Sequence, residues 1–260
     1  MTDNELKELL DTLALRYDQP EFIEADPISI PHSFSRKEDI EIGGFLAATI
    51  AWGNRKAIVK SARRMMEYLD DAPYDFIMEA SDAELDGLAT YVHRTFNGGD
   101  LRAFVLALRG LCNSYGSLGG YFEKRWSERG DMREVLSDFR HDFFDCPHPH
   151  RCEKHLSSID RKAACKRLNM YLRWMVRPDP AGVDFGLWRS IPASALYLPL
   201  DVHSGNVARG LGLLKRRQND WAAVEQVTAR LRDFDPSDPV RYDFALFGAG
   251  INAAAETSSI

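Results

Sequence analysis

The chain has 260 residues, and its 45% hydrophobic and 28% charged content is typical of a soluble globular protein with one large domain or two small ones. Its formal charge of −6 argues against a protein that coats nucleic acid generally, although a local basic face stays compatible with that charge. No apolar run approaches the roughly 18 residues of a membrane span, and the acidic N-terminus is unlike a signal peptide. Four cysteines are too few for a disulfide scaffold, so we expect a cytoplasmic protein with reduced thiols and no membrane partner.

Helical spacing of the apolar residues dominates the chain from its beginning. Residues 4–16 form the first such stretch, and three prolines between residues 18 and 34 predict a loop. The candidate helix starts are the capping boxes Ser35–Glu38 and Ser81–Glu84 and the N-caps Asn54 and Asp100. Further helices are expected over about 131–144, 161–177, 202–214, 220–232 and 238–250.

No run of alternating apolar and polar residues predicts a strand, and no alternation of strands with helices predicts a Rossmann fold or a barrel. We therefore expect an all-α fold of two helical lobes with a cleft between them. One lobe is expected to span roughly residues 36–200, and the other to combine residues 1–35 with residues 201–260.

Basic residues gather in one part of the chain. Between residues 151 and 177 only Glu153 and Asp160 oppose them. Such a run is typical of a solvated helix face, and it is also compatible with a nucleic-acid-binding face. Its members are Arg151, Lys154, Arg161, Lys162, Lys166, Arg167, Arg173 and Arg177.

A lysine and an aspartate near this run form a candidate catalytic pair. Lys166 lies at the flank of the apolar stripe of its predicted helix, where it can face a cleft. Asp201 follows Pro199 and precedes a helix, which predicts an N-cap. A capping aspartate can still present one oxygen to a ligand, so the structural and the catalytic interpretation of Asp201 are compatible.

Lysine and aspartate together can attack the anomeric carbon of a sugar through a Schiff base. The amine is nucleophilic only when neutral, and neighbouring cations favour the neutral form. Lys162 is predicted to lie one turn before Lys166 on the same side of the helix, so it is a rival nucleophile.

Four stretches of the sequence resemble the helix-hairpin-helix DNA glycosylase superfamily, which includes endonuclease III and the 8-oxoguanine glycosylases. The resemblance covers about residues 38–70 and 160–252, and it is carried by "GGFLAATIAWGNRKAIVKSARRM", "CKRLNMYLRWMVR", "YLPLDVHSGNVARGLGL" and "DPVRYDFALFGAGI". The whole chain also looks like a bacterial family of uncharacterised proteins that shares the second and third stretches.

The resemblance implies a DNA repair glycosylase, a hydrolase that can also be an abasic-site lyase, acting as a monomer on damaged duplex DNA. Lys166 would be the Schiff-base lysine and Asp201 the catalytic aspartate. The spacing between them is nearer to that of the archaeal 8-oxoguanine glycosylases than to that of endonuclease III. No cysteine follows Cys165, so no iron–sulfur cluster is expected.

One departure from the superfamily pattern keeps alternatives open. The hairpin before the lysine normally carries a glycine-rich turn that binds a DNA phosphate, whereas "SSIDRKAA" contains no glycine. Lys162 therefore stays a rival to Lys166, and a non-catalytic nucleic-acid binding protein on the same fold is the main alternative function. An enzyme that acts on nucleotides or RNA is a third hypothesis, because the overall charge is acidic.

Further residues are candidates for contacts with DNA or with an extruded base. The alternative interpretations are simpler: Asn54 is a helix cap, His203 is a surface histidine, and the aromatic residues are core. Candidates for DNA contact are Asn54, Arg55, Arg161, Arg167 and His203, and candidates for the base pocket are Trp52, Tyr242 and Phe244.

A cysteine- and histidine-rich segment is the one candidate metal site. Cys146, His148, His150 and Cys152 have the right donors for zinc, but their alternating spacing lacks the loops that let one ion reach four ligands. A solvated or DNA-facing loop is therefore the favoured interpretation, and no metal or cofactor is expected.

Overall fold

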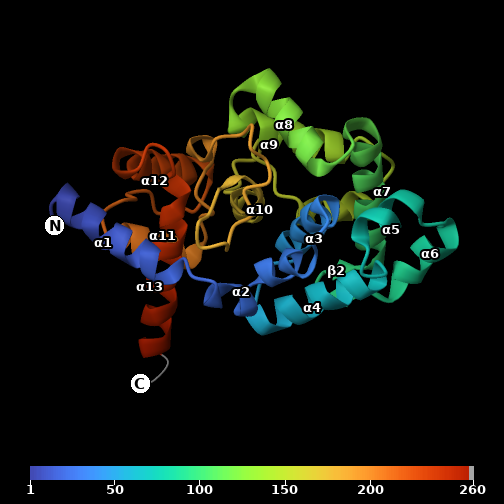
Figure 1. Cartoon of the computed structure of the whole chain (residues 1–260), viewed down its shortest axis with the longest axis horizontal. Helices are drawn as coiled ribbons and strands as arrows, with labels where there is room; N and C mark the ends of the chain where they lie inside the picture. Colours follow the sequence, from blue (N-terminus) through green and yellow to red (C-terminus); the bar gives the residue numbers. More distant parts are fainter. Residues whose placement is uncertain (258–260) are drawn as a thin grey trace. The chain divides into compact units, whose positions relative to one another are not determined.

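The computed structural model describes residues 1–257, of which α-helix is the dominant structure (Figure 1). The chain is 66% helix and 3% strand, which confirms the all-α prediction. Within residues 1–257, no helix is both long enough and apolar enough to cross a membrane.

The chain separates into two compact units. Unit one combines Met1–Phe22 with the chain from Ser158 onward, and unit two is Ile23–Ser157. These boundaries differ from the expected ones near residues 36 and 200. The stretch before residue 200 belongs with the C-terminal helices because it is hydrogen bonded to them: the Trp221 amide donates to the Lys162 carbonyl oxygen over 2.9 Å.

Unit one is built from α-helices and two short 3-10 helices. Its first helix has a capping box in which Thr2 and Glu5 bond each other's backbone amides, and it buries Leu6, Leu10 and Ala14 at helical spacing. This helix packs on the last helix of the chain, as does α11 (Figure 1). The elements are α1 (Asp3–Tyr17), α10 (Lys166–Val176), η5 (Ala193–Ala195), α11 (Val202–Gly210), α12 (Trp221–Phe234), η6 (Pro239–Arg241) and α13 (Tyr242–Thr257).

Unit two is a helical bundle with one small hairpin. The short helix α2 (Glu21–Ala25) spans the boundary before it. The remaining elements are η1 (Pro27–Ser29), η2 (Pro31–Ser33), α3 (Lys37–Thr49), α4 (Arg55–Tyr68), α5 (Pro73–Glu79), α6 (Asp82–Gly87), η3 (Leu88–Thr90), β1 (Val92–His93), β2 (Phe96–Asn97), α7 (Gly98–Tyr115), α8 (Leu118–Arg129), α9 (Met132–Phe143) and η4 (His150–His155).

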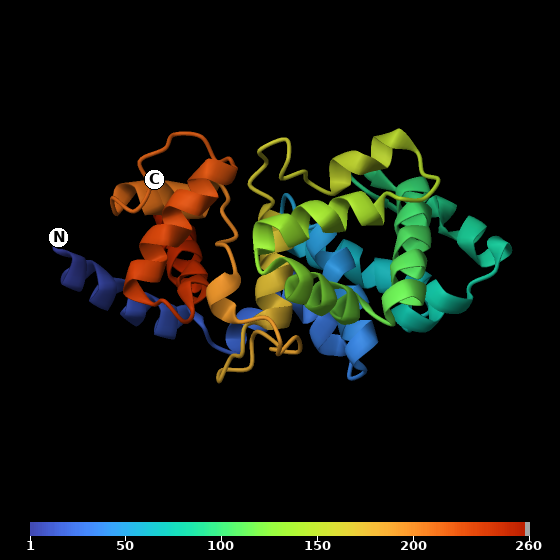
Figure 2. The same cartoon turned by 90° about the horizontal axis from the view of Figure 1, so that it is seen from above.

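The core of unit two is a cluster of phenylalanine rings around α3. Every residue of α3 from Asp39 to Thr49 is buried, so this helix lies inside the unit. Phe45 contacts Phe104, Phe139 and Phe143 with ring centroids 5.5–6.2 Å apart. Those three rings come from α7 and α9, which pack together with α8 (Figure 2). Aromatic packing of this kind supplies much of the hydrophobic stabilisation of a domain.

Two of the predicted helix starts are confirmed. Ser81 forms a complete capping box with Glu84, and Asn54 caps α4 by accepting from the Ala57 amide. The box predicted at Ser35 is wrong: Arg36 takes the N-cap position without a side-chain cap bond, and Glu38 pairs with Arg36 instead.

The start of α7 also differs from its prediction. The helix begins at Gly98 with Asn97 as its N-cap, and Asp100 is the third-position partner that bonds the Asn97 amide. The β1–β2 hairpin directly before it was not predicted, because two-residue strands have no detectable alternation.

We predict that Gly98→Ala destabilises the protein by about 1–3 kcal/mol or more, because its Cβ would overlap backbone atoms that cannot rotate away. The added carbon would lie 2.6 Å from the Cα of Ala89 and closer still to the Leu88 carbonyl oxygen. Gly99→Ala is the matched control, since its Cβ would meet only the Asn97 side chain at 3.5 Å. Urea denaturation should show a loss for the first variant and a change within about 1 kcal/mol for the second. Equal stability of the two variants would contradict this packing.

Candidate functional site

The helix that carries the candidate lysine begins later than predicted. We expected a helix over 161–177, whereas α10 begins at Lys166. Lys162 and Cys165 have φ values of 62° and 49°, in the left-handed region that residues other than glycine rarely adopt. These two residues make the turn in a segment that has no glycine. Lys162 is therefore an exposed turn residue and does not share a helix face with Lys166.

Lys166 and Asp201 are brought together in unit one. The Lys166 Nζ lies 4.0 Å from the Asp201 Oδ2, and each side chain is 27% exposed. The same amine lies 3.3 Å from the sulfur of Met170, one turn further along α10. The pair is thus half-buried, with an apolar neighbour on one side and access to solvent on the other.

Asp201 is the N-cap of α11, as its sequence position predicts. Its Oδ1 accepts from the Ser204 amide over 2.9 Å and from the Ser204 hydroxyl over 3.2 Å. In return, the Asp201 amide donates to the Ser204 hydroxyl over 3.0 Å. One carboxylate oxygen is therefore fixed by the cap. The other oxygen, Oδ2, faces Lys166.

A second carboxyl group, that of Asp243, lies near this pair. It sits in the first turn of α13, buried, and accepts from Arg173 Nη1 over 2.5 Å. Burial raises its pKa to about 6, because the loss of solvation and the repulsion from Asp201 outweigh the attraction of Arg173 and Lys166. Lys166 and Asp201 are both close enough to Asp243 to act on its charge.

Asp243 was missed at the level of sequence. A signal for it existed: a single acidic residue stands within "YDFALF", where its neighbours are apolar on both sides. Charged residues are rarely buried without a partner, so an acidic residue in a core stretch indicates a buried ion pair.

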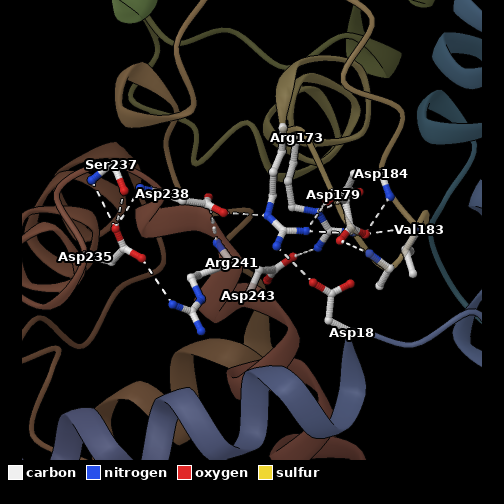
Figure 3. A network of polar contacts seen from close by, with 12 residues as sticks. Asp18, Arg173, Asp179, Val183, Asp184, Asp235, Ser237, Asp238, Arg241 and Asp243 are labelled. Carbon is white, nitrogen blue, oxygen red and sulfur yellow. Dashed lines mark hydrogen bonds and ion pairs between the residues drawn. The ribbon is translucent and has the colours of Figure 1, made fainter.

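Two arginines are buried among carboxylates: Arg173 in the last turn of α10, and Arg177, the C-cap of that helix. Figure 3 shows Arg173 within this network. Arg173 contacts Asp184 and Asp243 at 3.2 and 2.5 Å. Arg177 extends the network with four further contacts, at 2.9 Å to Asp18, 3.6 Å to Asp179, 3.1 Å to Asp184 and 2.8 Å to Asp238.

This network corrects the interpretation of residues 151–177 as one basic face. Arg173 and Arg177 are buried ion-pair donors. Arg151 belongs to unit two and pairs with the fully buried Asp100 over 2.6 Å. The run therefore contributes exposed charge chiefly at Lys154, Arg161 and Lys162.

Carboxylates outnumber arginines in the network, and the pKa values of the carboxyl groups shift in different directions. Burial raises the pKa of Asp18 to about 6, against the opposing attraction of Arg177, with Asp179 adding repulsion. Burial also raises the pKa of the fully buried Asp184. For Asp179, burial is outweighed by Arg177 and by three backbone N–H donors, so its pKa is lowered.

The remaining candidates of unit one fall into exposed and buried groups. Arg161 and His203 are exposed, and His203 lies in the first turn of α11. Arg167 is half-buried, and burial lowers its pKa to about 10. Tyr242 and Phe244 are buried packing residues: the Tyr242 hydroxyl donates to Asp11 over 2.8 Å, and Arg173 lies 4.2 Å above the Phe244 ring.

The candidates of unit two lie around the turn between α3 and α4. Trp52 is half-buried and stacks at 5.9 Å on His155, with His93 edge-on at 5.2 Å. Asn54 is the cap of α4 and Arg55 its first residue. The structure places these residues in a different unit from Lys166 and Asp201.

The cysteine- and histidine-rich segment uses its polar groups for local contacts. His148 Nδ1 lies 2.6 Å from the Cys146 carbonyl oxygen, and His150 Nδ1 lies 2.7 Å from Glu153. Cys152 is buried, and burial raises the pKa of its thiol to about 11, which disfavours the thiolate that binds metals. Within the described residues, no group of three or more histidine, cysteine or acidic side chains is arranged to hold a metal ion.

A match to a known protein family spans most of the chain. Residues 26–252 match a family described as "Protein of unknown function (DUF2400)". The chain belongs to this family. The match includes Lys166, Asp201 and Asp243. No curated protein and no solved structure matches the chain.

We predict that Asp18→Asn changes stability in a pH-dependent way. The pKa of Asp18 is about 6 in the folded protein, against an ordinary value of 3.8. Ionisation of Asp18 therefore lowers the free energy of unfolding by up to about 3 kcal/mol. This stability is present below about pH 4 and is lost as the pH rises to above 6. Asparagine carries no such charge. Urea denaturation should therefore show the stability of the variant, relative to wild type, rising by up to about 3 kcal/mol between about pH 4 and 8.

The control for this prediction is Asp233→Asn, which changes an exposed aspartate of α12 outside the network. Its stability difference from wild type should stay nearly constant over the same range. A constant difference for Asp18→Asn as well would show that Asp18 ionises normally in the folded protein.

Proposed function

We propose that the protein is a DNA repair glycosylase of the helix-hairpin-helix type with abasic-site lyase activity. The observation that carries this proposal is the Lys166–Asp201 pair, in which a half-buried amine lies 4.0 Å from the free oxygen of a capping aspartate. The resemblance of the surrounding segments to that superfamily assigns the same two residues the catalytic roles.

The proposed reaction uses the neutral Lys166 amine as nucleophile. Its nitrogen forms a bond to the sugar C1′ of a damaged nucleotide while the C1′–N bond to the base breaks, and the electron pair leaves with the base, which takes up a proton. The Asp201 carboxylate accepts the proton released by the attacking amine. It also stabilises the positive charge that develops on the sugar.

Strand cleavage follows from the same covalent bond. The sugar ring opens to give an imine between Lys166 and C1′, and the ring oxygen takes up the proton held by Asp201. Water then removes a proton from C2′ while the C3′–O bond breaks, so that the 3′ phosphate departs with the bonding electron pair. Water then hydrolyses the imine and restores the lysine. The extruded nucleotide must first leave the base stack, which costs a few kcal/mol.

Local structure supports a fixed carboxylate in this role. The cap bonds hold Oδ1 of Asp201, and the Asn219 side-chain amide donates to its backbone carbonyl over 2.8 Å. Asp243, which is bonded to Arg173 and interacts electrostatically with both members of the pair, adds a second carboxyl group whose pKa of about 6 lies close to neutral. A preorganised acceptor of this kind does not have to reorient during the reaction.

The main alternative, a non-catalytic nucleic-acid binding protein, is favoured by one observation. The turn before α10 is made by Lys162 and Cys165, without the glycine amides that bind phosphate in the superfamily. This alternative predicts salt-dependent binding with no covalent chemistry.

We predict that borohydride traps a covalent complex between the wild-type protein and duplex DNA that contains an abasic site. Lys166→Ala should abolish the adduct, because the amine that forms the imine is absent. Lys162→Ala should keep it, because Lys162 is an exposed turn residue outside α10. The measurement is a denaturing gel of trapped complexes, with 8-oxoguanine DNA as a second substrate.

Two substitutions of Asp201 separate its cap from its chemistry. Asp201→Asn keeps an N-cap of comparable quality, so stability should change little while adduct formation falls by about 100-fold or more. Asp201→Ala should lose about 1 kcal/mol of stability in addition. No adduct with the wild type, or an adduct unchanged by Lys166→Ala, would contradict the proposed lyase.

A further inference from the structure

The loop between α11 and α12 forms a basic surface in unit one. A shallow hollow of about 610 Å³, wide open to solvent, lies there, and none of its lining side chains is acidic. We call it the 215–226 hollow, after its lining residues Lys215, Arg216, Arg217, Gln218, Ala222 and Gln226. Three consecutive cations therefore face one concave surface of a chain whose net charge is negative.

Two of these cations are available for a ligand. Arg216 forms a bidentate ion pair with the Asp220 carboxylate, with its Nε 2.6 Å from Oδ1, so its charge is largely matched. The side chains of Lys215 and Arg217 are exposed, and neither makes a hydrogen bond or ion pair with any described residue. Two unmatched positive charges beside a matched one favour a ligand with repeated negative charge.

The backbone of this loop is held from both neighbouring helices. Arg209 of α11 donates to the carbonyl oxygens of Arg216 and Arg217 over 2.8 Å each. Gln226 of α12 accepts from the amides of Lys215 and Arg216 over 3.2 Å each. The loop is therefore fixed before any ligand arrives, which lowers the ordering cost of binding. Arg209 also occupies two carbonyl oxygens that would otherwise repel an anion.

The same bonds connect the hollow to Asp201. The side-chain oxygen of Asn219 accepts from Arg209 over 2.5 Å, and its side-chain nitrogen donates to the Asp201 carbonyl oxygen over 2.8 Å. The loop that carries Lys215 and Arg217 is thus tied, through a single residue, to the cap of α11. A strand bound in the hollow would run beside the element that presents the catalytic carboxylate.

We propose that the 215–226 hollow binds the phosphodiester backbone of duplex DNA next to the Lys166–Asp201 pair. The identity of the ligand rests on the proposed function, whereas the site itself rests on the charge and geometry of the loop. Cationic side chains that contact phosphates position the duplex without reading its sequence. Lys215 and Arg217 take this role, while the chemistry belongs to Lys166 and Asp201.

The test compares Lys215→Gln/Arg217→Gln with a control pair of equal charge change, Lys124→Gln/Arg189→Gln, whose wild-type side chains are also exposed. Fluorescence anisotropy measures binding of a labelled duplex with an abasic-site analogue between about 50 and about 200 mM salt. The first pair should weaken binding by about 10-fold or more and reduce the salt slope by about 2, whereas the control should change affinity less than about 2-fold. Both variants should melt at the wild-type temperature, since the altered side chains are exposed.

Equal affinities and salt slopes for the two pairs would overturn the assignment of the hollow. A loss confined to single-stranded DNA or to RNA would overturn the choice of duplex DNA. Failure of the proposed function is distinguishable: the wild type would then give no trapped adduct, while the selective loss of duplex binding in Lys215→Gln/Arg217→Gln would stand. Trapped adducts together with control-like binding would reject the hollow alone.

Discussion

The ion network of Arg173 and Arg177 is the constraint on which the site depends (Figure 3). Burying two guanidinium groups is costly unless each is surrounded by carboxylates, and removing one partner from such a pair typically costs about 3–5 kcal/mol. The network therefore fixes the C-terminal half of α10 against Asp184, Asp238 and Asp243. Because the helix is rigid, its first residue is fixed as well, which sets where the Lys166 amine lies.

The position of Asp201 is fixed independently of the ion network. Ser204 holds one oxygen of its carboxylate, and Asn219 holds its carbonyl oxygen. The distance of 4.0 Å between Lys166 and Asp201 follows from two separate anchors, the ion network and the helix cap. Asn219 lies in the loop beyond α11 and also accepts from Arg209, so this residue links the cap at Asp201 with the loop that forms the basic hollow.

Periodicity and caps predicted the helical class and the caps at Asn54 and Asp201, whereas the pairing of Lys166 with Asp201 was implied by the resemblance to the glycosylase superfamily. They did not predict the late start of α10, because a left-handed backbone at Lys162 and Cys165 carries no signal in residue type. Nor did they show that Arg173 is buried, since a basic run looks the same on a solvated face as beside carboxylates distant in sequence. Long-range pairing decides such positions, and it is not visible in local spacing.

In the proposed mechanism, the amine of Lys166 forms the covalent bond to the sugar beside Asp201. The most direct measurement is peptide mass mapping of the wild-type adduct after borohydride reduction and complete nuclease digestion. We expect the residual sugar mass on the peptide that contains Lys166. The same mass on Lys162, on another lysine or on the N-terminal amine would contradict it.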